Sequence, residues 1–532
     1  MMNTSITLRN RSRFGIFGQF KDMNTAIQST YKVISAAIRR FHFPINQTAL
    51  EIFRVTIGLL ILVDLLIRFT DLEAHYTNLG VLPKNYSFID SLIRFGKIDI
   101  FFFSESFFYH QLVFVVGFVS AFAFCIGFKT KLSQIMLWIV LLSVQNRIPY
   151  INEGADIYIR VIFFWSLFLP LGKKFTFRNL MSKPENSTSP IYSTVDSIAL
   201  YVYSVQIGLV YLCSVLVKAK TSYWPSGRAL ELAFQVDVVR GQFAELLLPH
   251  TGILHFLTYL TLGVQFVGFL ALVCPPNFMK RLRVIIFGTL IGMHLGIALT
   301  LAVGLFPYFA IFSLIPLFPQ FGSMKKSYVN KKRGNKFKDG IRIALITASL
   351  LYVSLRFIDY YNLVRFTFPT PLNKVYRYYG KLTGLNQQWI MFSGIEYNPY
   401  GLVIGRSSQS QTEIIFEVKK LKRQAWDKEN DSIRYEFSDL FSGYRWKKLF
   451  VKAFWTNNYK LYNGIGTYIC RKTSDLSKSD YFTTVEFIFF HEKFKSDFEQ
   501  KELVECHRAQ FSCSSRHLNM THRCDYLQPR RF

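Results

Sequence analysis

Long apolar stretches recur along the first two thirds of the chain, and basic clusters separate them. About 20 mostly apolar residues are needed to span the hydrocarbon core of a bilayer as a helix. The sequence contains about nine such stretches, at 49–69, 109–128, 132–145, 157–171, 196–217, 252–274, 284–303, 305–319 and 341–358. This pattern predicts a polytopic α-helical membrane protein with about nine spans.

After residue 358 the pattern changes to short alternating runs typical of β-strands. The runs Gly401–Arg406 and Glu413–Val418 flank a polar turn and predict a hairpin, and Tyr481–Phe490 is a further β-rich run. The periodicity of Leu449–Trp455 fits a helix or a strand equally well. We therefore expect a C-terminal mostly β or α+β soluble domain over 359–500, followed by a flexible tail over 501–532.

Composition and charge support the membrane interpretation. Half of the 532 residues are hydrophobic and 17% are aromatic, which argues against an ordinary soluble enzyme. The formal net charge of +29 would suggest nucleic-acid binding in a soluble protein. Because the basic residues instead cluster between the apolar stretches, we expect the lipid bilayer, and no nucleic acid, as the partner.

The distribution of Lys and Arg also predicts the topology. The loops between the spans alternate between the two sides of the membrane. The set that includes the N-terminal segment holds more Lys and Arg than the other set, so the positive-inside rule predicts a cytoplasmic N-terminus. With nine spans, the C-terminal domain then lies on the outer face of what we take to be a bacterial inner membrane. The expected order is a basic cytoplasmic segment (1–48), a multi-span membrane domain (49–320), a basic cytoplasmic linker (321–340), the last transmembrane helix (341–358) and the outer domain.

Four of the seven cysteines lie in the predicted outer domain and tail. Four thiols form two disulfides in three alternative pairings, which the sequence does not distinguish. Their spacing does not match that of zinc knuckles, and we predict no metal site. These residues are Cys470, Cys506, Cys513 and Cys524.

Several ionisable residues lie within the apolar stretches, where a charge is costly and is therefore a functional candidate. Glu51 and Arg54, Asp64 and Arg68, and Asp156 and Arg160 are spaced three or four residues apart, which places each pair on one helix face. Such spacing favours structural ion pairs over catalytic roles. The common soluble motifs for nucleotide binding, zinc proteolysis and serine hydrolysis are absent from the sequence.

Lys218 differs from these residues because it ends a long apolar stretch and is followed by Lys220 and an amphipathic segment over 224–248. Its side chain either extends to the aqueous face or is enclosed by protein. In the second case desolvation, together with the neighbouring Lys220, would favour a neutral amine that can act as a base. His294, in the middle of a later stretch, is a candidate partner, a proton carrier or a core histidine.

Five segments of the predicted membrane domain form an ordered set of motifs: Arg54–Gly58 with Asp64, Asp71–Pro83, Gly154–Asp156 with Leu169–Gly172, Val210–Gly227, and His294–Gly296 with Gly304–Tyr308. Taken in order, they resemble the HTTM domain. This membrane domain is shared by vitamin K-dependent γ-carboxylases, sporulation-delaying peptide maturation proteins and many bacterial proteins. The resemblance covers roughly residues 45–320, and Gln388–Phe392 is similar to part of the outer domain in longer bacterial members.

The resemblance to the carboxylases implies a reaction. In that family a lysine deprotonates vitamin K hydroquinone, whose reaction with oxygen yields a base that removes a glutamate γ-proton before carbon dioxide adds. Lys218 is the best match to this lysine and Lys220 the second. The resemblance thus implies reduced vitamin K or another quinol as cofactor and a peptide or protein substrate on the outer side. The candidate site comprises Lys218 and His294 as catalytic residues and Tyr211, Trp224, Asp156 and Arg160 as substrate-binding residues.

Two segments depart from the carboxylase pattern. Asn152–Asp156 replaces a histidine-bearing stretch, and Leu169–Gly172 replaces the segment that follows it. These differences keep a second hypothesis open, in which the chain is a non-catalytic membrane protein for peptide maturation, lipid binding or partner binding.

Overall fold

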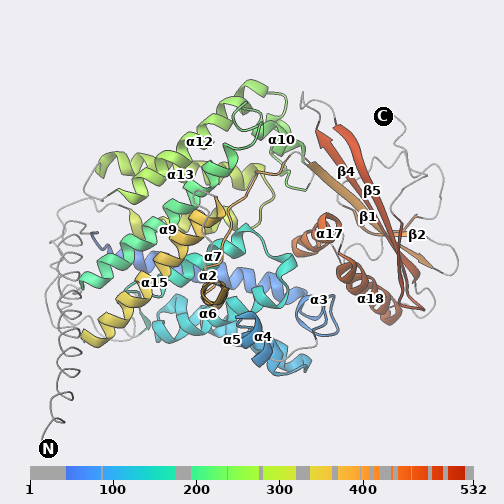
Figure 1. Ribbon diagram of the computed structural model, residues 1–532, viewed down its shortest axis with the longest axis horizontal. Coiled ribbons are helices and arrows are strands. Elements are labelled where there is room, and N and C mark those ends of the chain that lie inside the picture. The colour runs from blue at the N-terminus through green and yellow to red at the C-terminus, as the bar shows by residue number, and fades with distance from the viewer. Residues whose placement is uncertain are drawn as a thin grey trace, which may run out of the picture.

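A computed structural model describes residues 43–521, with gaps at 85–87, 174–175, 178–192, 237, 275–279, 319–335, 362–369, 396, 408–411, 418–432, 435–440, 442, 457, 477–481 and 495–500. The described chain forms a helical part and a C-terminal sheet (Figure 1). The predicted cytoplasmic segment 1–48 lies almost entirely outside the described residues, as does most of the predicted linker 321–340.

Thirteen α-helices precede the C-terminal domain in the described chain, and three short 3-10 helices lie among them. The α-helices are α2 (Gln47–Thr70), α3 (Leu72–Tyr76), α4 (Phe88–Phe95), α5 (Phe107–Ile126), α6 (Thr130–Arg147), α7 (Gly154–Ser166), α9 (Thr194–Lys218), α10 (Ala229–Gln235), α11 (Ala244–Leu247), α12 (Thr251–Val273), α13 (Lys280–Thr300), α14 (Phe306–Ser313) and α15 (Lys336–Tyr360). The 3-10 helices are η1 (Ile100–Phe103), η2 (Pro149–Ile151) and η3 (Ile315–Leu317).

Local signals in the sequence explain several helix ends. The Ser193 hydroxyl accepts a hydrogen bond from the backbone N–H of Asp196, whose carboxylate accepts from the N–H of Ser193, so α9 begins with a capping box. Glu153 and Asp156 cap α7 in the same way. Helix α5 ends at Gly127, whose φ of 74° is the left-handed conformation that glycine adopts most easily.

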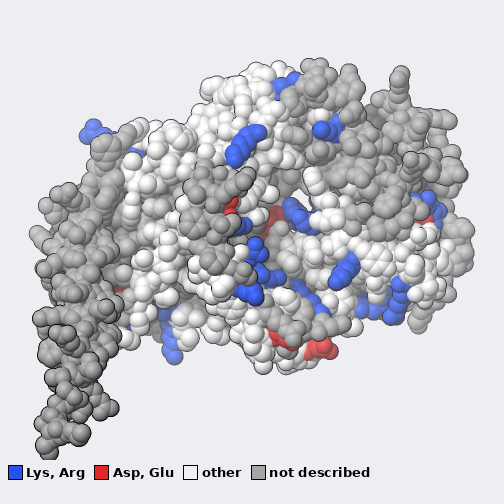
Figure 2. Space-filling view, viewed as in Figure 1, with Lys and Arg blue, Asp and Glu red and all other residues white. Residues whose placement is uncertain are grey.

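Five helices in the described chain are long and apolar enough to cross a membrane. They are Phe107–Ile126, Thr194–Lys218, Thr251–Val273, Arg281–Thr300 and Phe337–Tyr360. Many of their large apolar side chains are exposed, and Figure 2 shows few charged side chains on the described surface of the helical part. These features indicate a membrane-embedded protein.

The other four predicted spans are also helical, but they do not have the length and composition of an apolar span. Helix α2 is long enough but carries four charged residues, while α7 and the α14–η3 segment are short. Helix α6 has a comparatively polar sequence. The count of nine spans therefore stays a prediction.

The C-terminal domain is α+β. A six-stranded sheet has the order β3-β2-β1-β4-β5-β6, in which only β2 and β3 are parallel. Helices α17 (Tyr444–Thr456) and α18 (Tyr459–Leu476) lie between this sheet and the helical part, and α16 (Thr370–Leu382) precedes the sheet (Figure 1). The strands are β1 (Tyr397–Ser407), β2 (Thr412–Glu417), β3 (Ile433–Arg434), β4 (Phe482–Phe494), β5 (Lys501–Ser512) and β6 (Leu518–Thr521).

The sheet confirms two predictions and corrects a third. The predicted hairpin is the antiparallel pair β1–β2, and the predicted run at 481–490 is β4. The ambiguous segment 449–455 is helical, in α17. The prediction of a flexible tail over 501–532 is wrong for β5 and β6. Backbone hydrogen bonds pair β5 with β4 and β6 with β5, and this pairing does not require an apolar pattern in the sequence of these strands.

Two of the three predicted ion pairs are present. Arg54 Nε lies 2.7 Å from Glu51, and Arg68 Nε lies 2.8 Å from Asp64, with all four side chains buried. The Arg54 guanidinium also donates to the carbonyl oxygens of Phe124 and Cys125, so it satisfies the C-terminal end of α5.

The third predicted pair, Asp156 with Arg160, is wrong, because Asp156 binds other guanidinium groups. It contacts Arg68 from α2 and Arg445 from α17, and Arg445 also reaches Asp64. Burial opposes the charge of Arg445, but the carboxylates of Asp156 and Asp64 outweigh this and raise its pKa well above its ordinary value. The four residues form a buried cluster, here called the interface cluster, that joins the sheet domain to the helical part.

Further polar contacts surround the interface cluster. Trp446 Nε1 donates to Asp71 at 2.9 Å, and Tyr444 donates to Glu153. The His75 ring packs at 4.8 Å from the Trp446 ring, and burial, reinforced by the nearby guanidinium groups, lowers the pKa of His75 to about 3. Its imidazole is therefore neutral, which leaves the cluster without an additional cation.

We predict that Arg445→Met destabilises the protein by about 3–5 kcal/mol, because two buried carboxylates would then share the single guanidinium of Arg68. Arg471→Met is the matched control, since Arg471 pairs with Glu73 on the surface and its loss should cost under about 1 kcal/mol. Denaturant unfolding in detergent measures both values, and equal losses would contradict a dominant role for the interface cluster.

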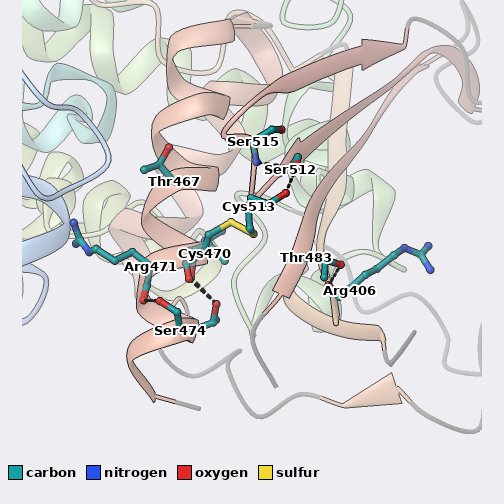
Figure 3. The surroundings of a disulfide bond; sticks show 12 residues. Arg406, Thr467, Cys470, Arg471, Ser474, Thr483, Ser512, Cys513 and Ser515 are labelled. Atoms are coloured by element: carbon teal, nitrogen blue, oxygen red, sulfur yellow. Dashed lines mark hydrogen bonds between the residues drawn. A yellow bond between two sulfur atoms is a disulfide. The ribbon is translucent and has the colours of Figure 1, made fainter. Parts of the chain in front are cut away.

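Cys470 on α18 and Cys513 after β5 form a disulfide (Figure 3). The pairing links two segments that are 43 residues apart in the sequence and ties α18 to the sheet. The side chain of Cys506 and the whole of Cys524 lie outside the described residues.

We predict that non-reducing peptide mapping recovers a linked pair of peptides containing Cys470 and Cys513. Replacing both cysteines with serine should lower stability by about 2–4 kcal/mol, because the unfolded chain is then no longer cross-linked. A Cys470–Cys506 peptide in place of the expected one would disprove the pairing.

Candidate functional site

A cavity inside the helical part brings together four of the six residues predicted for the site. Its volume is about 680 Å³, counting space that is open to solvent. Most of the wall residues come from α9, α10, α12 and α13, and on each of these helices they lie along one face. The lining is Val210, Tyr211, Ser214, Lys218, Trp224, Leu230, Ala233, Thr261, Gln265, His294, Ile297, Leu301, Phe306, Trp389, Met391 and Phe392.

The Lys218 amine lies in this cavity and not in water. The residue is 3% exposed, and its Nζ donates to Gln265 Oε1 at 3.0 Å. It also lies 4.4 Å from the centre of the Trp224 ring, whose π face attracts a cation. Among the ion pairs of the described residues none involves Lys218, so a neutral amide and an indole are its polar neighbours.

His294 and Tyr211 form a second polar group on the cavity wall. The Tyr211 hydroxyl lies 2.9 Å from His294 Nε2, and both residues are buried. In the described structure His294 Nδ1 is buried without a hydrogen-bond partner. A buried polar atom without a partner is costly, so His294 has capacity to bond a ligand.

Aromatic side chains close the remaining walls. Trp224 Nε1 donates to the carbonyl oxygen of Phe392 at 2.8 Å, which ties the loop after α9 to the segment before β1. Trp389 Nε1 donates to Gln387 Oε1, and Gln387 in turn bonds Gln206 on α9. These bonds fix the orientation of two indoles that would pack against a flat apolar ligand.

Gly384–Phe392, here called the strap, crosses from α16 to the sheet domain and supplies three residues to the cavity. Arg160 anchors it: Nε donates to the Gly384 carbonyl at 2.8 Å, and Nη2 donates to the Asn386 carbonyl at 2.9 Å. Arg160 was predicted to bind substrate, but it lies outside the cavity lining and positions the strap.

Asp156 also lies outside the cavity lining, in the interface cluster. The structure therefore brings together Lys218, His294, Tyr211 and Trp224, and it gives Asp156 and Arg160 structural partners. The wall residues that sequence reasoning did not assign to the site come from α9, α10, α12, the α13–α14 region and the strap. Gln388–Phe392 had been singled out by resemblance, whereas nothing in the pattern around Gln265 indicated that it would contact Lys218.

The arrangement has the features of a site for an apolar molecule with an acidic hydroxyl. A buried amine can accept a proton, a phenol–imidazole pair can donate or relay one, and apolar walls exclude water. Among the described residues no group of three or more His, Cys, Asp or Glu side chains gathers as metal ligands would.

No known protein family, no curated protein and no solved structure matches this chain.

We predict that Lys218 resists chemical modification. An amine-reactive reagent applied to the folded protein in detergent should label the exposed Lys220 readily and Lys218 far more slowly, because the cavity encloses its Nζ. Mass spectrometry of the digested protein measures both sites. Equal labelling of the two lysines in the folded protein would place the Lys218 amine in water.

Proposed function

We propose that this chain is a multi-pass membrane enzyme of the HTTM type that uses a quinol in the Lys218 cavity and is related in mechanism to the vitamin K-dependent γ-carboxylases. One observation carries the proposal: a buried lysine amine, which forms no ion pair within the described part of the chain, shares an aromatic-lined cavity with a Tyr–His pair. The resemblance in sequence supports the choice of quinol and of carboxylation.

The membrane placement follows from the apolar helices. We propose that they cross an inner membrane, with the sheet domain on the outer face. The Cys470–Cys513 disulfide supports that side, since disulfides persist in oxidising compartments. Lys218 is the last residue of α9 and Trp224 follows in the next loop, so the cavity would lie near the outer end of this helix.

The residues present fit a reduced quinone. Its ring would lie against Trp224 and Trp389, and its hydroxyl groups would meet the Lys218 amine and the unpaired His294 Nδ1. When bound, such a quinol supplies, on reaction with oxygen, a base strong enough to remove a glutamate γ-proton.

The chain's own residues would then hold and move the first proton. Nζ of Lys218 would accept the proton of a bound hydroxyl. Gln265 orients the amine through a 3.0 Å hydrogen bond. The indole of Trp224 lies 4.4 Å from Nζ and would stabilise the ammonium that forms.

The test is a carboxylation assay in membranes with a glutamate-containing peptide, reduced vitamin K and labelled bicarbonate. We expect the wild type to incorporate label and Lys218→Ala to lose about 10²–10⁴-fold in rate, the usual contribution of a positioned base. Lys220→Ala is the matched control because its side chain is exposed two residues away, and it should retain activity.

Two outcomes would contradict the proposal. Equal incorporation by wild type and Lys218→Ala at matched expression would remove Lys218 from the reaction. An absence of incorporation in the wild type, with vitamin K and with other quinols, would favour the non-catalytic alternative of peptide maturation, lipid binding or partner binding.

A further inference from the structure

Arg283, in the first turn of α13, is a buried cation that forms no hydrogen bond or ion pair among the described residues. The residue is 2% exposed, and its Nε, Nη1 and Nη2 atoms all lack a hydrogen-bond partner. None of the ion pairs formed by the described residues includes it, which distinguishes it from Arg54, Arg68 and Arg445. A buried charge left unpaired in this way is strongly unfavourable, so the site is incomplete without an anion.

Aromatic rings form the surroundings of the guanidinium. Its central carbon lies 5.3 Å from the centre of the Phe43 ring and 5.5 Å from that of Phe287. Phe43 is fixed in place, because its backbone N–H and carbonyl both bond the Ser197 hydroxyl on α9. Tyr201, one turn further along α9, contacts Phe43 and donates to the carbonyl of Val273 at the end of α12. Among the described residues, the guanidinium therefore lies against aromatic rings and forms no ion pair with a carboxylate.

We propose that the phosphate of an anionic phospholipid binds Arg283 at this point. A guanidinium pairs with phosphate oxygens through two parallel hydrogen bonds, so one phosphate would satisfy nitrogens that now have no acceptor.

The location favours a lipid over a free anion. Arg283 lies where α12 ends and α13 begins, and both helices have the length and composition of membrane spans. A site between the ends of two spans meets the headgroup layer of a bilayer, and basic pockets between transmembrane helices bind phospholipid headgroups. The Ser197 end of α9 also lies here, whereas Lys218 is at the other end of that helix, so the site is separate from the proposed quinol cavity.

The test uses the full chain in nanodiscs of phosphatidylcholine, with or without phosphatidylglycerol. We expect the wild type to retain phosphatidylglycerol in native mass spectrometry after extraction and to unfold at a higher temperature when that lipid is present. Arg283→Gln should reduce retention roughly tenfold, as expected for loss of a charge-assisted hydrogen-bonded pair. Arg281→Gln is the matched control, since Arg281 is exposed, and should retain the lipid as the wild type does.

Arg283→Lys is a second variant that controls for a folding defect. It keeps the positive charge but cannot form two parallel hydrogen bonds to a phosphate, so it should retain an amount of phosphatidylglycerol between those of the wild type and Arg283→Gln. Equal retention by wild type and Arg283→Gln would overturn the proposal. Inorganic phosphate is also added to the protein in nanodiscs of phosphatidylcholine alone. If it raises the unfolding temperature as much as phosphatidylglycerol does, the site binds a free anion and the assignment to a lipid is overturned.

Discussion

The arrangement of this chain depends on the buried interface cluster of Asp64, Arg68, Asp156 and Arg445. Two guanidinium groups face two carboxylates from three different helices. Asp64 and Arg68 pair within α2, but Asp156 on α7 and Arg445 on α17 find their partners only when the three helices are in place. Hydrophobic contact between the two parts would tolerate sliding, because it has no preferred direction. Hydrogen-bonded charges in a low-dielectric interior do not tolerate such sliding, because a displaced charge would lose its partner. They therefore fix the position of the sheet domain on the helical part.

That fixed docking also shapes the cavity. The strap begins near Arg160 on α7 and ends before β1, which pairs with β2 and β4 and packs against α17. Both ends of the strap are thus attached to elements that the interface cluster holds together. Trp389, Met391 and Phe392 reach the cavity from this strap, so its walls belong to the helical part and to the segment that leads into the sheet domain.

The buried cations of the described chain fall into three classes. Arg147 donates to the backbone carbonyl oxygens of Tyr76, Thr77 and Leu82. Arg54, Arg68 and Arg445 have carboxylate partners within the protein, and their charges serve the fold. Lys218 and Arg283 have no acidic partner there, and they lie toward opposite ends of α9. A cation that the fold leaves without a counter-charge is a place where a ligand can contribute binding energy.

The sequence by itself determined the class of structure: apolar runs of sufficient length become helices, alternating runs become strands, and the i+3 and i+4 charges of α2 pair because they share a helix face. The sequence also placed Lys218, His294, Tyr211 and Trp224 in one candidate site, because they lie in segments that resemble the HTTM domain in the same order. Only the tertiary structure decided that Asp156 pairs with Arg68 and Arg445, that Arg160 holds the strap, and that 501–521 completes a sheet. Local periodicity places a side chain on a face of its own element, but the partner that meets it comes from residues hundreds of positions away.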